Sequence, residues 1–171
     1  MIVVDAMILA YALVGVPEHT PAVNRLLDLD LAWAGPPLWR NELRNVLLQY
    51  IWVPETDRPG DAVTLGDAQR KMHLAETLIG ERTFGVESDA VLDIAQTTGL
   101  SAYDGEYVAL AQEVDVPLVT TDGAILQAVP DVAVRPDDIT ASENALCYGV
   151  RYVCSRVQAQ IETAEAHIRS R

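Results

Sequence analysis

Short apolar runs rich in β-forming residues alternate with amphipathic stretches along the first 140 residues, and this alternation limits the fold more than any other feature of the chain. We expect strands at residues 2–4, 31–34, 116–120 and 132–134, with a further short strand at 84–86. We expect helices at residues 6–14, from 20 onward, and at 38–51, 65–79, 88–99, 101–114 and 122–129. Strands that alternate with helices favour a parallel sheet between two helical layers, an α/β/α sandwich.

The helical assignments depend on side-chain spacing and on breaker residues. The stripe Trp39, Leu43, Val46, Leu47 and Tyr50 has helical periodicity, which predicts one buried face. Pro21 follows Thr20 at a position typical of the first turn of a helix, and we expect the apolar face of that helix to be Val23, Leu26 and Leu27. Residues 54–60 contain two prolines and read as a polar loop. The three tryptophans are interpreted as core or interface residues.

Residues 141–171 are predicted to be an amphipathic helical extension to a domain that covers residues 1–140. One helix face carries the apolar residues Val150, Val153, Val157, Ile161, Ala164 and Ile168. Such a stripe is costly to leave in water, so we expect it to pack on the domain, on a second copy of the chain or on another protein. Cys147 and Cys154 are seven residues apart, too far along one helix for a disulfide.

The overall charge of the chain limits the kinds of binding surface that we expect. The net charge is −13, which argues against a broad phosphate-binding surface but is compatible with a carboxylate cluster that holds cations.

Half of the residues are hydrophobic, enough to form a core. No apolar run reaches the ~18 residues of a transmembrane helix, and the N-terminal segment lacks the basic start of a signal peptide. We therefore expect a cytoplasmic protein with no membrane partner.

Four acidic residues stand out as candidate metal ligands. Asp5 and Asp122 each follow an expected strand, and open α/β sheets place their sites at the carboxyl ends of parallel strands. Asp104 lies in the first turn of the helix that Ser101 opens, and Glu42 lies at the rim of a buried helix face. Converging carboxylates repel one another unless cations neutralise them, and oxygen ligands suit Mg²⁺ or Mn²⁺. Such sites support hydrolysis of phosphodiester bonds.

Each of these residues also has a purely structural interpretation. Asp5 and Asp122 are suited to cap the helices that follow them. Ser101 and Asp104 have the spacing of a capping box, and Glu42 could be a solvated charge at the rim of its helix.

Four segments together resemble the PIN domain family, and most of all the VapC-type ribonuclease toxins of bacterial toxin–antitoxin pairs. They are residues 2–6 (IVVDA), 36–47 (PPLWRNELRNVL), 101–111 (SAYDGEYVALA) and 117–122 (PLVTTD). The resemblance covers about residues 1–138. It implies a PIN-like sandwich with a short parallel sheet, an Mg²⁺-dependent endoribonuclease site, an antitoxin that blocks the substrate groove, and a homodimer. In that family, Asp5, Glu42, Asp104 and Asp122 would be the metal-binding residues.

The chain departs from the family pattern at position 7. The family usually has Ser, Thr or Asn there, whereas this chain has Met7, which cannot order a water molecule in the same way. An alternative function is therefore a catalytically weakened PIN-like module that acts through RNA or protein contacts. A phosphatase-like α/β enzyme is disfavoured because the chain has no DxDxT motif.

Overall fold

Four short strands form a parallel sheet at the centre of the described chain. The computed structural model describes residues 1–29, 31–53 and 63–139. The strands are β1 (Ile2–Val4), β2 (Trp33–Ala34), β3 (Leu118–Val119) and β4 (Ala133–Val134), in the order β2-β1-β3-β4. The register places Val3 of β1 opposite Ala34 on one side and Leu118 on the other. β1 is thus an interior strand, and all three of its residues are buried.

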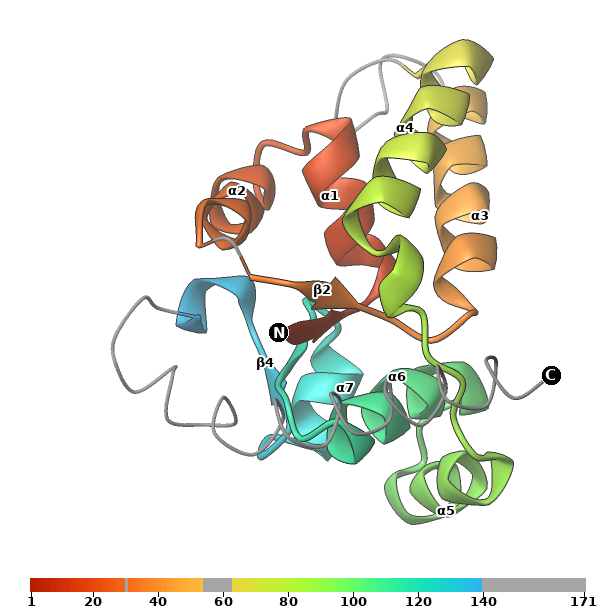
Figure 1. The fold of residues 1–171 in the computed structure, drawn as a ribbon, viewed down its shortest axis with the longest axis vertical. Helices are drawn as coiled ribbons and strands as arrows, with labels where there is room; N and C mark the ends of the chain where they lie inside the picture. Colours follow the sequence, from red (N-terminus) through yellow and green to blue (C-terminus); the bar gives the residue numbers. More distant parts are fainter. Residues whose placement is uncertain (30, 54–62, 140–171) are drawn as a thin grey trace, which may run out of the picture.

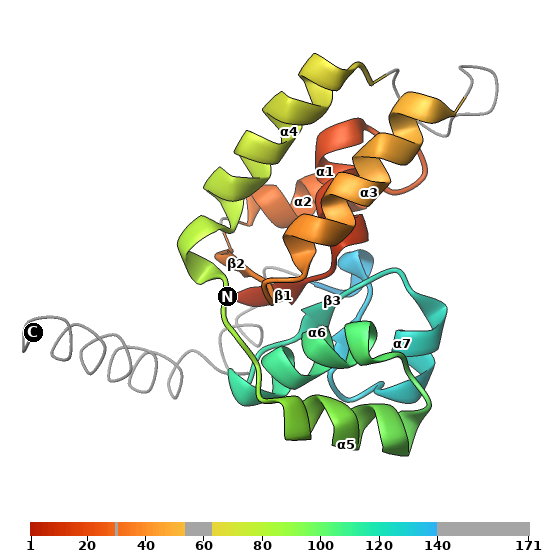
Figure 2. The same ribbon diagram turned by 90° about the vertical axis from the view of Figure 1, so that its right-hand side faces the viewer.

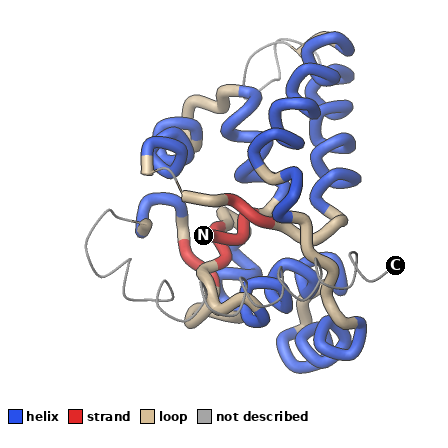
Figure 3. The backbone as a smooth tube through the Cα atoms, viewed as in Figure 1, coloured by secondary structure: helices blue, strands red, loops and turns tan. Residues whose placement is uncertain are grey.

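Helices cover both faces of this sheet. One layer holds α1 (Ala6–Val14), α2 (Thr20–Asp28), α3 (Trp39–Trp52) and α4 (Leu65–Leu78) (Figure 1). The other layer holds α5 (Ser88–Thr98), α6 (Ala102–Glu113) and α7 (Gly123–Ala128), on the opposite side of the strands in both views (Figure 2). Figure 3 shows the strands between the two groups of helices. The predicted α/β/α sandwich is confirmed.

Two short 3-10 helices complete the described chain. They are η2 (Gly80–Arg82) after α4 and η3 (Pro136–Asp138) after β4. None of the helices in the described part is both long and apolar enough to cross a membrane. The loop expected at 54–60 and the extension expected at 141–171, with Cys147 and Cys154, lie outside the described residues.

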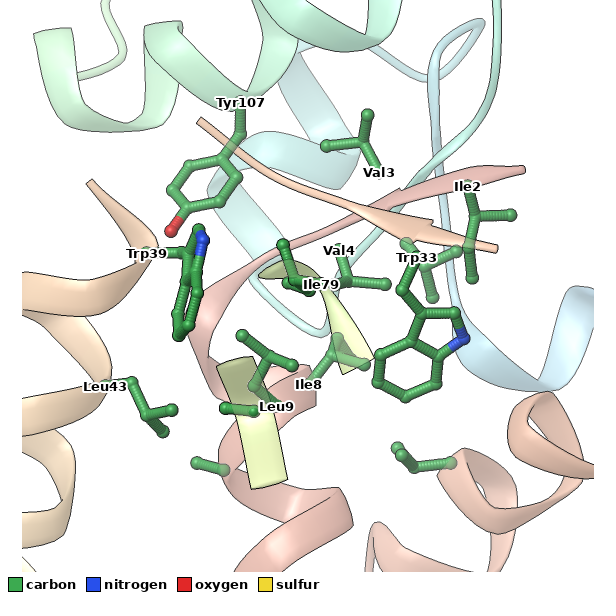
Figure 4. Close-up of a cluster of buried hydrophobic side chains, with 14 of the residues drawn as sticks. Ile2, Val3, Val4, Ile8, Leu9, Trp33, Trp39, Leu43, Ile79 and Tyr107 are labelled. Carbon is green, nitrogen blue, oxygen red and sulfur yellow. The ribbon is translucent and has the colours of Figure 1, made fainter. Parts of the chain in front are cut away.

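Most of the predicted side-chain burial is observed. Trp39, Leu43, Leu47 and Tyr50 of α3 are buried, and Val46 is half-buried. Figure 4 shows how Trp39 and Leu43 join side chains from β1, α1 and β2 in one hydrophobic cluster. Such burial stabilises the fold by about 1.5–3 kcal/mol for each large apolar side chain.

Two side chains are more exposed than a core position would give. Leu27 was expected on the apolar face of α2, yet it is 36% exposed because that face turns toward the core at Val23 and Leu26. Trp52, the last residue of α3, is 71% exposed and so does not belong to the core; its place in an interface stays a prediction.

The strands are shorter than the apolar runs predicted. The runs at 31–34, 116–120 and 132–134 each contribute two residues to the sheet. The segment 84–86 is not a strand. Thr83 forms a single parallel bridge with Gly35, and the Phe84 amide donates to the Gly35 carbonyl at 3.2 Å before the chain leaves the sheet edge toward α5.

Candidate active site at the carboxyl end of the sheet

Asp5 is the buried centre of the acidic site. It directly follows β1 and caps α1, with the Ile8 amide donating to Oδ1 at 2.9 Å. The Thr120 hydroxyl donates to Oδ2, and Asp5 is only 7% exposed. Burial raises the pKa of Asp5 to about 6 despite these hydrogen bonds, and the charge of Glu42 raises it further. A carboxylate ionised here is therefore held at a cost in free energy.

Thr120 connects Asp5 to Asp122. Its hydroxyl oxygen accepts from the Asp122 amide at 2.9 Å while its proton goes to Asp5, and the residue is completely buried. Asp122 then caps α7, since its Oδ1 accepts from the amides of Ala124 at 2.7 Å and Ile125 at 3.2 Å. The two aspartates thus share one edge of the sheet, as their positions after β1 and β3 predicted.

Glu42 comes from α3 and is held by Tyr107 of α6. The Tyr107 hydroxyl donates to Glu42 Oε2 at 2.5 Å. Partial burial raises the pKa of Glu42, the hydrogen bond lowers it, and the charges of Asp104 and Glu106 raise it again. Glu42 is half-buried, which agrees with its predicted place at the rim of the helix face.

Asp104 occupies the first turn of α6 in a complete capping box. Its Oδ2 accepts from the Ser101 amide at 3.2 Å and from the Ser101 hydroxyl at 2.6 Å, and its own amide donates back to that hydroxyl at 3.2 Å. The capping interpretation is thus confirmed for Asp104, as it is for Asp5 and Asp122. Capping occupies one face of the carboxylate and leaves its charge able to act on Glu42.

The four predicted residues are therefore connected in one series, by charge interactions and by the hydrogen bonds of Thr120. Asp104, Glu42 and Asp5 interact through their charges in that order, and Asp122 joins Asp5 through Thr120. Within residues 1–29, 31–53 and 63–139, no three His, Cys, Asp or Glu side chains are close enough together to hold a metal ion. The donor set, all carboxylate oxygen, has the chemistry that Mg²⁺ prefers.

The sequence analysis missed three residues of this site. Thr120 follows β3 at the same edge as Asp122, so strand position alone could have indicated it. Tyr107 lies three residues after Asp104, which places both on one face of α6. Glu106, whose charge acts on both Glu42 and Tyr107, had no distinguishing signal.

Comparison with known proteins gives structural likeness without a sequence match. No model of a known protein family matches the chain, and no curated protein matches its sequence. A structure of PAE2754 from Pyrobaculum aerophilum superposes with a TM-score of 0.59 and 22% identity, covering 80% of this chain and 90% of that one. Its fold is PIN-like.

Two further structures extend the likeness. A toxin–antitoxin complex from Klebsiella pneumoniae matches with a TM-score of 0.58 and 15% identity, covering 81% of this chain and all of the matched chain. FitAcB from Neisseria gonorrhoeae matches with a TM-score of 0.53 and 18% identity, over 81% of this chain and 100% of that one. The described chain has a PIN-like fold. At these identities the likeness is one of architecture.

Proposed function

We propose that this protein is a metal-dependent endoribonuclease that acts as the toxin of a toxin–antitoxin pair. The observation that carries the proposal is that carboxylates from three separate elements interact near the carboxyl end of a parallel sheet: the charge of Asp104 acts on Glu42, and the charge of Glu42 acts on Asp5. Structural capping explains the aspartates singly, but it gives no reason for Glu42 to join them. A bound cation removes the repulsion among the carboxylates.

Three of the four residues assigned to the metal have one carboxylate oxygen that accepts no hydrogen bond from the described residues. Those hydrogen bonds reach only Oδ2 of Asp104, Oε2 of Glu42 and Oδ1 of Asp122, whereas both oxygens of Asp5 accept one. We assign Asp5 and Asp104 to the principal Mg²⁺, with Mn²⁺ as an alternative, and Glu42 and Asp122 to completing the site and positioning the attacking water. When bound, such an ion lowers the pKa of water and stabilises charge on the leaving oxygen.

The proposed partners rest on the likeness to solved structures and on the family resemblance. The Klebsiella pneumoniae structure with this architecture is a toxin–antitoxin complex, which supports a cognate antitoxin for this chain. RNA is the substrate class, and the family resemblance favours a homodimer in the cytoplasm. The −13 net charge means that RNA binding depends on the cations at the acidic site more than on a basic surface.

A catalytically weakened PIN-like binding module is the second candidate. Met7 favours it, because its thioether is a poor hydrogen-bond acceptor for an ordered water molecule in the first turn of α1. The absence of a preformed three-ligand group among the described residues also favours it. The two functions differ in whether the protein cleaves RNA.

The test is an RNA cleavage assay on the full chain with Mg²⁺, with Mn²⁺ and with EDTA. We expect cleavage in either metal, none in EDTA, and loss of activity in Asp104→Asn. Ser101→Ala separates ligand from cap: it breaks the capping box at a cost of ~1 kcal/mol in stability while the Asp104 carboxylate remains, so cleavage should continue. The matched control is Asp93→Asn, which changes an exposed aspartate of α5.

The outcomes separate the two candidates. Cleavage that survives Asp104→Asn would refute the assignment of Asp104 as a ligand. A wild-type chain that binds RNA but cleaves none in either metal would favour the binding module.

A further inference from the structure

We propose that Tyr107 is a positioning residue that fixes Glu42 in the orientation needed for cation binding. This inference rests on the proposed nuclease function and deepens it by adding a residue to the same site. Its basis is the 2.5 Å hydrogen bond from the Tyr107 hydroxyl to Glu42 Oε2, which joins α6 to α3.

The Tyr107 ring is held rigidly. Tyr107 is 2% exposed and belongs to the hydrophobic core, although its hydroxyl reaches a half-buried carboxylate. In Figure 4 the ring extends from α6 and its hydroxyl points toward the side of the cluster where Trp39 lies. Trp39 is itself completely buried, and its Nε1 donates to the Thr83 hydroxyl at 3.1 Å. A donor fixed in this way defines where Glu42 Oε2 can lie.

Glu42 needs such a restraint. A half-buried glutamate side chain has several rotamers available, and the charges of Asp104 and Glu106 disfavour the orientation that brings it toward the other carboxylates. The bond from Tyr107 opposes that repulsion and occupies one oxygen only. With Oε2 held by Tyr107, the position of the second oxygen, Oε1, is restricted too. Oε1 accepts no hydrogen bond from the described residues.

The same helix face supplies a metal-site aspartate and the restraint. Asp104 and Tyr107 are three residues apart on α6, so a shift of this helix moves both together. Hydrogen-bond partners of metal-binding side chains commonly change metal affinity 10–100-fold when they are removed. A structural tyrosine that merely filled the core would have no such effect.

The experiment measures Mn²⁺ binding to the full chain by isothermal titration calorimetry, without RNA. Tyr107→Phe keeps the ring and removes the hydroxyl, and we expect the Kd for Mn²⁺ to rise about tenfold. The matched control is Tyr103→Phe, which removes a hydroxyl from the same helix at a residue 63% exposed, and its Kd should equal that of the wild type. Thermal unfolding of the metal-free proteins checks that each variant folds.

A double-mutant cycle tests whether Tyr107 acts through Glu42. In the Glu42→Gln background, Tyr107→Phe should change the Kd by less than twofold, because the carboxylate that it positions is gone. In RNA cleavage, Tyr107→Phe should raise the metal concentration that gives half-maximal rate and leave the KM for RNA unchanged.

The results distinguish this inference from the function on which it rests. If Glu42→Gln weakens Mn²⁺ binding but Tyr107→Phe does not, the positioning role is refuted and the metal site stands. Equal tenfold losses from Tyr107→Phe in both backgrounds would also refute it, since the effect would not pass through Glu42. A wild-type protein that binds no Mn²⁺ would overturn both proposals.

Discussion

Replacing Asp5 by asparagine should stabilise the metal-free protein at neutral pH. Burial holds the pKa of this carboxyl at about 6, against 3.8 for the ordinary group. The folded state therefore binds this proton more tightly than the unfolded state, so Asp5 makes stability fall as the pH rises from about 4 to about 6. At 1.36 kcal/mol per pKa unit, the ionised group costs about 3 kcal/mol at pH 7.5.

Asparagine removes this cost but disturbs one hydrogen bond. Its Oδ1 can still accept from the Ile8 amide, whereas its amide nitrogen would face the Thr120 hydroxyl, which now donates to Asp5. The Thr120 oxygen can accept from this nitrogen as well as from the Asp122 amide, but the Thr120 proton loses Asp5 as its acceptor. Losing this arrangement costs about 1 kcal/mol. The net gain at pH 7.5 is about 2 kcal/mol, or roughly 4–8 °C in Tm for a chain of this size.

The assay is urea unfolding in EDTA at several pH values between 4 and 7.5, on the wild type, on Asp5→Asn and on Asp93→Asn as the exposed control. We expect the stability curves of the wild type and Asp5→Asn to cross in this range, with the variant less stable by about 0.5 kcal/mol at pH 4, where the Asp5 carboxyl of the unfolded wild type is already partly ionised. Asp93→Asn should follow the wild type throughout. An Asp5→Asn protein that is less stable than the wild type by the same amount at pH 4 and at pH 7.5 would show that Asp5 carries no burial cost.

Three further predictions concern other parts of the chain. Met7→Ser should cleave RNA faster than the wild type at saturating Mg²⁺, and equal rates would show that position 7 does not affect catalysis. Gly105→Ala should lose about 1–3 kcal/mol in urea unfolding, since an added Cβ would lie 3.2 Å from the Val91 carbonyl oxygen of α5; full stability would contradict this close approach. Deleting residues 145–171 should lower the molecular mass that light scattering measures in solution, as expected if this segment forms the dimer contact. A truncated protein that keeps the full-length mass would exclude that role.

The sequence determined the layered architecture because its signals are local. Alternation of apolar runs with amphipathic stretches predicted the parallel sheet and both helical layers. Capping residues predicted where helices begin, as at Ser101 and Asp122. The stripe from Trp39 to Tyr50 predicted the buried face of α3, since helical spacing is independent of the rest of the chain.

Strand length was decided by tertiary pairing. The run at 132–134 is apolar along its whole length and the run at 116–120 is apolar as far as Val119, but each contributes only two residues to paired strands. The expected strand at 84–86 lies beyond β2 at the sheet edge, where a single bridge at Thr83 is all that forms. Apolar composition predicts burial and does not by itself provide a pairing partner.

The candidate site also has one part that the sequence predicted and another that only tertiary packing decided. Strand position predicted that Asp5 and Asp122 share a sheet edge, because the carboxyl ends of parallel strands always lie together. The buried hydrogen bond from Thr120 to Asp5 joins two residues that are 115 positions apart in the sequence. The hydrogen bond from Tyr107 on α6 to Glu42 on α3 joins two residues that are 65 positions apart. Such contacts depend on how helices pack across the sheet, a long-range property that residue spacing within one element does not contain.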